Sequence, residues 1–458
     1  MGRSLAGVLV VVALVLGIAL LDEGRDRDGA DGIVAAQVER AGSQGSQTSQ
    51  GGETEAFGGG SLTDCLGALG ADPPDESTFP GLDQRGVDQI ARRVEGLREL
   101  KFGGPVDANF LAPGDLDARI LELSGGGAVR ELARRQGAAL ELLGAIPDGD
   151  DLYELTTDTL EDQVVGLYAP ETKELLVSAS GSPGAVEEIT LAHELEHALA
   201  DDDLGLPLAG RVRAGEGDAA LAAQALIEGD ATLTMQLYAL RYVSLGDQLD
   251  IGSDPEVAGA GLGDIPDILR RQLLFPYEAG LQFVCDRYAE GGWDAVDEAY
   301  ADPPTSTAEL LGLRDTDPVE PPPSGALEKP WRPILRDQLG AATLAWLFAA
   351  PGGEPDRAIP APRDAIAGWA GDRVTLWERG KGAAAVQALS LTIVDEGGTL
   401  CGATVAWYAA TDPDAELGRE GDTTTFAGAD RDAAITCDGG TVRLGIAPDA
   451  ALAATLSS

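Results

Sequence analysis

The chain has only two histidines, and both lie in one pentapeptide, His193-Glu194-Leu195-Glu196-His197. On a helix, residues four apart differ by about 40° around the axis, so both imidazoles can reach one ion from one face. Zn²⁺ binds two such nitrogens and a carboxylate oxygen, and it leaves a fourth position for water. The metal lowers the pKa of that water, and a nearby carboxylate can accept its proton. The pentapeptide therefore predicts a zinc site that hydrolyses amide bonds.

The general base in this chemistry is one of two glutamates. Glu194 and Glu196 lie on opposite flanks of the histidine pair, so helical geometry alone does not choose between them. The H-E-x-x-H motif assigns the base to the residue directly after the first histidine, which is Glu194. Glu196 then supports the ligands or faces solvent.

The site needs a third ligand, and two residues are candidates. Glu228 lies in the segment LIEGDAT, and a carboxylate in such apolar surroundings is costly to bury unless it is paired or bound to metal. Asp203 stands where the longer metzincin motif has its third ligand. That motif requires a glycine to turn the chain, and this chain has Ala200 at that position. We therefore expect Glu228 to be the third ligand.

Local patterns predict the elements that position these residues. Residues 164–168 and 174–178 are short extended runs around a turn-like connector, which predicts a β-hairpin. Ser182-Pro183 predicts the start of a helix that carries the histidines to about residue 200. An Ala-rich helix over 218–245, long enough to be interrupted at Gly229, carries Glu228. Helical spacing also occurs in residues 87–100, 115–123, 128–143, 265–275, 278–289, 293–300 and 335–349.

The first residues predict export. Arg3 precedes an uncharged apolar run over 5–21, at the lower edge of the length that spans a bilayer. No A-x-A-like cleavage site follows, which favours a retained membrane anchor over a cleaved signal peptide. With Arg3 on the cytoplasmic side, the rest of the chain faces away from the cytoplasm in either case.

The remaining sequence divides into three parts. Residues 22–61 are rich in Gly, Ser and Gln and predict a flexible linker. A domain with the zinc motif is expected over 62–334, and a smaller C-terminal unit over 335–458. The proline-rich stretch 319–333 predicts a surface crossing between them.

The composition limits the partners. The chain has 77 acidic and 32 basic side chains, a formal net charge of −45. A surface this acidic repels the phosphate backbone of nucleic acids, and we therefore expect no nucleic-acid partner. We expect a protein or peptide substrate and a membrane contact through the N-terminal segment. The oligomeric state is open.

Four cysteines suit an exported protein, because disulfides persist outside the cytoplasm. Four cysteines allow three pairings, of which we expect Cys401 with Cys437 and Cys65 with Cys285. The sequence has no C-x-x-C pair, which argues against a cysteine-based metal site.

HELEH followed by LIEGDAT resembles the gluzincin branch of the HExxH zinc peptidases, the peptidase-MA-like group. The resemblance implies that a glutamate on the second helix, here Glu228, completes the site. The hairpin VVGLYAPETKELLV also resembles the strand that precedes the motif helix in these enzymes. That likeness implies an edge strand that pairs with an extended peptide substrate. Its residues are Leu175, Leu176, Val177 and Ser178.

The resemblance extends beyond the metal motif and also has gaps. The segments FPYEAG, GGWDAVDEAY, PPTSTAELL and AIAGWAGDRVTLW resemble a group of uncharacterised exported proteins that carry HExxH. Gluzincins commonly have an acid four residues after the third ligand, where this chain has Thr232. The group that steadies the oxyanion has two candidates here, Tyr277 and Tyr300.

Together these patterns predict an α+β protein. Its core is mainly helical and zincin-like, with a small β-hairpin before the motif helix and a small C-terminal α+β unit. The predicted function is a zinc endopeptidase that acts on proteins or peptides outside the cytoplasm. The alternative is a metal-binding but catalytically degenerate envelope or interaction protein.

Overall fold

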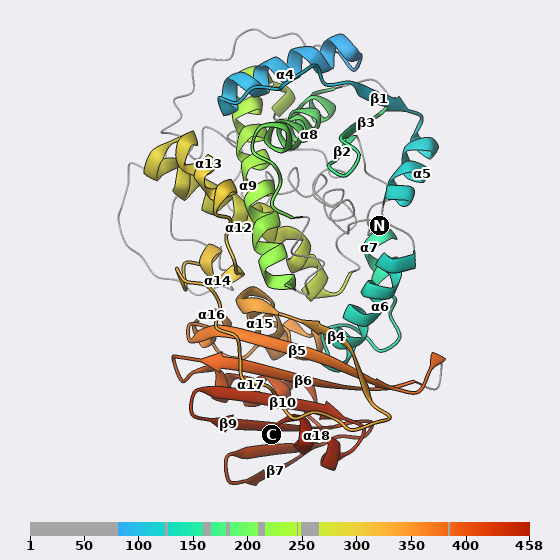
Figure 1. Cartoon of the computed structure of the whole chain (residues 1–458), viewed down its shortest axis with the longest axis vertical. Coiled ribbons are helices and arrows are strands. Elements are labelled where there is room, and N and C mark those ends of the chain that lie inside the picture. The colour runs from blue at the N-terminus through green and yellow to red at the C-terminus, as the bar shows by residue number, and fades with distance from the viewer. Residues whose placement is uncertain are drawn as a thin grey trace.

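The computed structural model describes residues 81–123, 127–158, 166–179, 184–208, 216–244, 246–248, 265–382 and 385–458. The expected N-terminal apolar segment, the linker and Cys65 lie outside these residues. Within them the fold is mixed α and β: helices dominate up to about residue 310, and one large sheet follows (Figure 1). None of the described helices is long and apolar enough to cross a membrane.

Two buried helices form the centre of the N-terminal part. Helix α8 (Ala185–Asp203) carries the histidine pentapeptide, and the Glu187 carboxylate accepts a hydrogen bond from Gly184 N at its start. Helix α9 (Gly217–Tyr242) is buried at every residue from Asp218 to Met235. A helix that is apolar nearly all round belongs inside a protein, which explains the Ala/Leu/Ile composition of α9.

Helix α9 runs unbroken through Gly229, so the expected interruption there is wrong. Helix α12 (Asp267–Gly291) packs against α9, and a Cβ at Gly229 would lie 2.2 Å from the Gly280 carbonyl. A Cβ at Gly280 would lie 2.0 Å from the Ala225 carbonyl oxygen. The two glycines therefore allow the backbones of α9 and α12 to touch.

Helix α12 joins two segments that the sequence pattern separates. Residues 265–275 and 278–289 are one helix that continues through Pro276. Proline lacks an N–H, so the helix loses one backbone hydrogen bond there without ending.

A three-stranded sheet lies beside α8. Its strands are β1 (Ala108–Leu111), β2 (Gly166–Ala169) and β3 (Glu174–Ser178). Strands β2 and β3 pair antiparallel, which confirms the predicted hairpin. Strand β1 pairs with the other side of β3, in parallel, so β3 is the middle strand. The prediction that Leu175, Leu176, Val177 and Ser178 form an edge strand is therefore wrong, and β2 is the outer strand of the hairpin.

Helices α5, α6 and α7 pack beside the three-stranded sheet. Leu167 of β2, Leu176 of β3 and Tyr277 of α12 share one apolar cluster with residues of α5, α6 and α7. This cluster packs the sheet against α12. The remaining bounds are α4 (Gln84–Arg98), α5 (Pro113–Leu123), α6 (Gly127–Leu142), α7 (Leu152–Asp158), α13 (Trp293–Ala301) and α14 (Thr307–Leu310).

The C-terminal unit is an antiparallel seven-stranded sheet with the order β4-β5-β6-β10-β9-β8-β7. Side chains alternate along β6: Leu389, Leu391 and Ile393 join the core with α15 and α17, while Ala388 joins the opposite face with α18. The strands are β4 (Arg332–Asp337), β5 (Trp369–Arg379), β6 (Val386–Asp395), β7 (Glu416–Glu420), β8 (Thr423–Ala427), β9 (Asp432–Asp438) and β10 (Thr441–Ala447). The helices are α15 (Gly340–Ala349), η4 (Pro351–Gly353), η5 (Pro355–Arg357), α16 (Pro362–Ala365), α17 (Leu400–Thr411) and α18 (Ala450–Leu456).

The cysteines follow the expected pairing where the structure describes them. Cys401 of α17 and Cys437 of β9 form a disulfide with a Cα–Cα distance of 5.9 Å, which confirms that prediction. Cys285 is buried in α12 and disulfide-bonded. Its expected partner, Cys65, lies outside the described residues.

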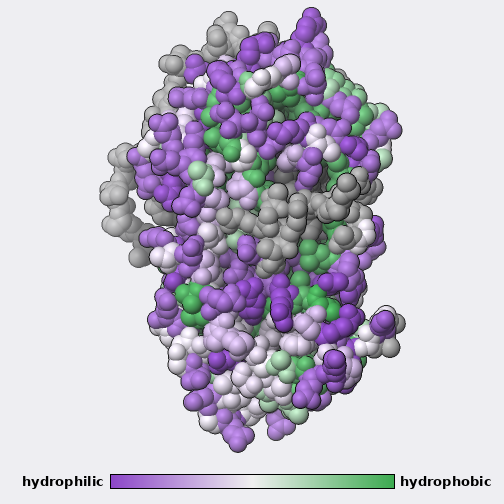
Figure 2. All heavy atoms as spheres, viewed as in Figure 1, coloured by the Kyte–Doolittle hydropathy of each residue, from purple (hydrophilic) through white to green (hydrophobic). Residues whose placement is uncertain are grey.

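The described surface is mostly polar. Figure 2 shows hydrophilic residues over most of the face in view, with apolar residues in small separate groups. Among the described residues, the large hydrophobic side chains that are exposed are Val319 and Leu417.

Three buried carboxylates lie where α9 meets the C-terminal unit. Asp218 accepts hydrogen bonds from the Thr307 hydroxyl at 2.6 Å and the Thr307 N–H at 3.2 Å, and its other oxygen has no hydrogen-bond partner in the part of the chain that the structure describes. Asp372 accepts from the first amides of α15, and Asp337 accepts from Gly217 N. Burial raises the pKa of Asp218 to about 7, and the charges of Asp372 and Asp337 add to the rise.

This raised pKa makes stability depend on pH. The folded state holds a proton on Asp218 that the unfolded chain releases near pH 4, so stability falls as pH rises from about 4 to about 7. We expect Asp218→Asn to remove this contribution, so the melting temperature of the variant relative to wild type should rise across that window and then level off. Calorimetry at closely spaced pH values measures the difference. A difference that is constant with pH would contradict the assignment.

The glycine contact between α9 and α12 predicts a large effect of one methyl group. Gly280→Ala should lower the free energy of unfolding by about 1–3 kcal/mol, because the backbones must separate to admit the Cβ. Gly96→Ala, at an exposed position of α4, is the matched control: open space surrounds it, so it should be neutral or stabilising by about 0.5–1 kcal/mol. Urea unfolding of both variants measures the two changes, and equal stability of the two would argue against the close contact.

Candidate metal centre

His193, His197 and Glu228 converge between α8 and α9. The two histidine Nε2 atoms lie 3.1 Å apart, and they lie 3.3 Å (His193) and 3.4 Å (His197) from Glu228 Oε2. All three side chains are at most 2% exposed. Each offers one ligand atom, and these atoms lie within 4.8 Å of one another, so the group could hold a metal ion. The structure thus brings together the three ligands predicted from the sequence.

This region is rich in buried acids. Glu194, Glu196, Glu228 and Asp230 are all 0% exposed. Arg98 is the one buried arginine or lysine in the described part of the chain. Burying an uncompensated charge costs several kcal/mol even after the surroundings relax. Within the described structure Glu228 Oε2 lies near the two histidine nitrogens, and a cation bound between the three side chains would interact with all of them.

The ligands polarise one another. Burial alone would raise the pKa of Glu228, but the two histidines outweigh it and lower that pKa to about 2. Burial would lower the pKa of His197, but Glu228 outweighs it and raises that pKa to about 9. Burial lowers the pKa of His193. Glu228 is therefore the anionic member of the group, as a carboxylate ligand must be.

Glu194 is held in place by the hairpin. The backbone N–H of Tyr168 on β2 donates to Glu194 Oε2 at 2.6 Å, while Glu194 Oε1 is buried with no hydrogen-bond partner among the described residues. Burial raises the pKa of Glu194 to about 8. A bound cation would favour its ionised form. Sequence reasoning placed the hairpin before the motif helix but missed this backbone contact, because a strand pattern does not show where its free N–H groups point.

The two tyrosine candidates have different surroundings. The ring of Tyr277 stacks on His193 with 6.4 Å between centroids, and its buried hydroxyl has no hydrogen-bond partner in the described structure. Burial, and then the charge of Glu228, raise the pKa of Tyr277 well above its usual range. The hydroxyl of Tyr300 instead donates to Asp230 at 3.0 Å. Of the two, only Tyr277 contacts a predicted ligand.

Behind the ligands lies an ion-pair network that the sequence did not reveal. Arg98 of α4 donates to both oxygens of Asp230, at 2.8 and 3.0 Å, and to Asp297 at 2.5 Å. Its guanidinium also lies over the ring of Trp293, 4.4 Å from the centroid. These residues are far apart in the sequence, so only the folded chain brings them together.

The other residues of interest lie outside the group. Asp203, the rival third ligand, is exposed at the last turn of α8. Thr232 is buried, and its hydroxyl has no hydrogen-bond partner in the described part of the chain. It therefore makes none of the contacts expected of an acid at that position.

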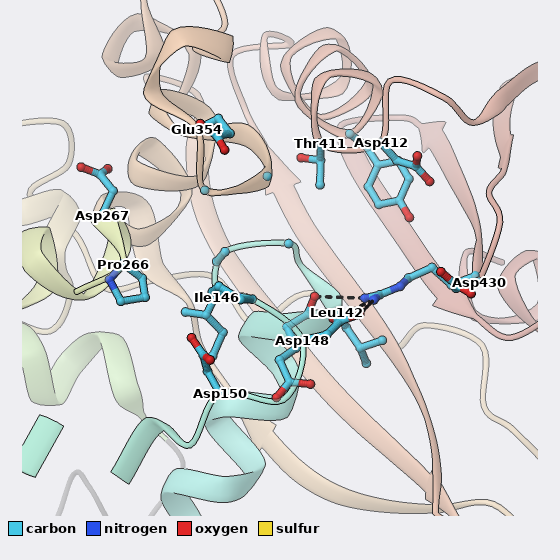
Figure 3. A pocket seen from close by; sticks show the side chains of 18 of the residues that line it. Leu142, Ile146, Asp148, Asp150, Pro266, Asp267, Glu354, Thr411, Asp412 and Asp430 are labelled. Atoms are coloured by element: carbon cyan, nitrogen blue, oxygen red, sulfur yellow. Dashed lines mark hydrogen bonds and ion pairs between the residues drawn. The ribbon is translucent and has the colours of Figure 1, made fainter. Parts of the chain in front are cut away.

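A cavity of about 730 Å³ lies elsewhere, between the turn after α6 and the C-terminal unit (Figure 3). Arg431 crosses it, donating to Asp148 and to the carbonyl of Glu141. Its lining contains none of the predicted metal ligands.

The comparison with known families covers only the sheet. Residues 332–456 match a domain of unknown function (DUF8575), which runs from β4 into α18. The match starts three residues before the boundary expected from the sequence, and it excludes the metal group. No curated protein and no solved structure matches the chain. A zincin core and membership of the gluzincins therefore remain hypotheses.

The geometry separates the two candidates for the third ligand. Glu228→Ala should lower zinc affinity at least about tenfold, because it removes the only carboxylate in the group. Asp203→Ala, a matched removal of an exposed carboxylate, should leave zinc content unchanged. Metal analysis of both proteins after dialysis against limiting zinc measures the effect. Loss of zinc from the Asp203 variant alone would favour the metzincin-like arrangement instead.

Proposed function

We propose that this protein is a zinc-dependent peptidase that hydrolyses peptide bonds outside the cytoplasm. The observation that carries the proposal is the buried group His193, His197 and Glu228, with Glu194 fixed beside it. Two imidazoles and one carboxylate form a donor set that suits zinc and leaves a position for water. In such a site, zinc supplies Lewis acidity and lowers the pKa of water.

The residues of the chain then have separate tasks. Glu194 Oε1 is free to accept a proton from the attacking water and to deliver it to the leaving nitrogen. The Tyr168 amide keeps the other oxygen of Glu194 in place during both transfers. The hydroxyl of Tyr277 stays protonated because of its raised pKa, so it can donate a hydrogen bond to the oxyanion of the substrate carbonyl.

The hairpin suggests how a substrate approaches. Strand β2 is an outer strand of its sheet, and its backbone already contacts Glu194 through Tyr168. An extended peptide that reached Glu194 would therefore run along β2 and could pair with its remaining backbone groups. Such pairing would involve the main chain of the substrate, so it fits a protease that acts on unstructured segments.

The location follows from the N-terminal residues. Arg3 and the apolar run over 5–21 support export with a membrane anchor, or secretion if the segment is cleaved. The disulfide between Cys401 and Cys437 suits the same compartment.

One observation favours an alternative. Thr232 replaces the acid that commonly supports the site in gluzincins, so the chain could bind metal without hydrolysing peptides. In that case it would be a metal-bearing envelope or interaction protein.

The role of Glu194 gives the test. Glu194→Gln should keep stoichiometric zinc but lower the hydrolysis of an unstructured protein such as casein by about 10²–10⁴-fold, because an amide cannot accept the proton. Glu171→Gln makes the same chemical change at an exposed position in the β2–β3 turn and should be fully active. A wild-type protein that cannot be loaded with zinc would refute the proposal. A zinc-loaded protein that cuts no peptide in a broad library would establish the alternative.

A further inference from the structure

The two ring nitrogens of His197 have different surroundings. Its Nε2 points to the metal group, 3.4 Å from Glu228 Oε2 and 3.1 Å from His193 Nε2. Its Nδ1 is buried, and no hydrogen-bond partner lies within reach in the described structure. When Nε2 is a ligand, Nδ1 carries the proton, and the acceptor of that proton fixes the orientation of the ring.

The carboxylate of Glu196 is the acidic group beside this nitrogen. Glu196 Oε2 lies 3.7 Å from His197 Nδ1, and the same carboxylate also interacts with Asp230. Glu196 is 0% exposed, so water does not satisfy these oxygens from the surface. A shift of under ~1 Å would bring the donor and the acceptor to hydrogen-bond distance.

The other residues that could orient His197 are excluded by their contacts. Thr232 occupies the position of the usual acid, and its hydroxyl contacts no hydrogen-bond partner in the described structure. Asp230 is on the neighbouring helix, but Arg98 binds both of its oxygens and Tyr300 binds one of them. The supporting acid must therefore come from α8 itself.

Glu196 also interacts with the buried ion-pair network around Arg98. Arg98 is close enough for its positive charge to interact with Glu196 as well as with Asp230. Arg98 is fixed in turn by Asp297 and by the ring of Trp293. Because the position of Arg98 is itself fixed, the nearby Glu196 carboxylate stays available to accept a hydrogen bond from His197.

We propose that Glu196 is the positioning residue for His197 and accepts its Nδ1–H, in place of the acid that gluzincins carry at the position of Thr232. The motif helix then supplies the two nitrogen ligands, the base and the support for one ligand within five residues. This inference rests on the proposed function only in requiring that the group binds zinc.

The test measures zinc affinity and the imidazole protons. Glu196→Ala should weaken zinc binding about 10–100-fold in competition with a chelator. Glu196→Gln should retain most of the affinity, because its amide oxygen still accepts. Thr232→Val, which removes a buried hydroxyl of similar size, should bind zinc as tightly as wild type. Circular dichroism of each zinc-free variant establishes that the fold is kept.

Nuclear magnetic resonance gives a second readout that does not depend on activity. Because the chain has only two histidines, the imidazole spectrum of the ¹⁵N-labelled zinc protein contains signals from two rings. The Nδ1–H of His197 should be downfield and protected from exchange in wild type and in Thr232→Val, and lost or shifted upfield in Glu196→Ala.

The outcomes separate this inference from the proposed function. Wild-type zinc affinity in Glu196→Ala, with an unchanged His197 signal, would overturn the role of Glu196 and leave the peptidase proposal standing. A wild-type protein that binds zinc and shows the Glu196 effect but cuts no peptide would overturn the peptidase proposal alone. Loss of affinity in Thr232→Val instead would assign the support to α9.

Discussion

Four carboxylates are buried where α8 meets α9, and each must be ion-paired, hydrogen-bonded or protonated there. This electrostatic constraint accounts for much of the architecture around it. Asp230 is paired with Arg98, so α4 must pack against α9. Glu194 takes a backbone amide from β2, so the hairpin must lie against α8. Glu228 interacts with the two histidines, in a group that could hold a metal ion. Other parts of the fold thus provide partners for Asp230 and Glu194, and the two histidines provide partners for Glu228.

The same constraint acts at the other end of α9. Asp218 begins the helix inside the contact with the C-terminal unit, where it meets Thr307 and lies near two further buried acids. In a chain with a formal net charge of −45, electrostatics alone would favour keeping these carboxylates in water. Their burial is balanced by hydrogen bonds from amides at helix starts, which is a strong environment for a carboxylate. Helix α9 therefore connects the metal group to the sheet through buried acids at both sites.

Local patterns in the sequence predicted the parts of this arrangement that depend on neighbours along the chain. Short-range rules account for three of them: the spacing of His193 and His197, the hairpin that precedes them, and the single glutamate, Glu228, within an apolar segment. Contacts between distant segments were missed. The pairing of β1 with β3, and the binding of Asp230 by Arg98, depend on tertiary packing that periodicity does not encode. The break expected at Gly229 failed for the same reason: propensity alone cannot distinguish a helix-weakening glycine from one required by a neighbouring backbone.

The C-terminal sheet shows the same limit from the opposite direction. The sequence predicted a helix over 335–349 and a small unit beyond it, whereas β4 occupies residues up to Asp337 and seven strands follow a single antiparallel order. Strand β6 does alternate, with Leu389, Leu391 and Ile393 separated by Ser390 and Thr392, but this local pattern does not show which strands pair or in what order.

The backbone contact between Gly229 and Gly280 also affects how residues of α9 and α12 are placed relative to one another in the candidate metal centre. Glu228 is the residue before one glycine, and Tyr277 lies about one turn before the other. With no side chain between the helices at this point, their separation is set by main-chain atoms, which have no rotamers to change. The backbone contact thereby sets the spacing between the helix positions from which Glu228 and Tyr277 project. If the proposed function holds, this fixed spacing would preorganise the two residues, a form of stabilisation on which enzymes depend strongly.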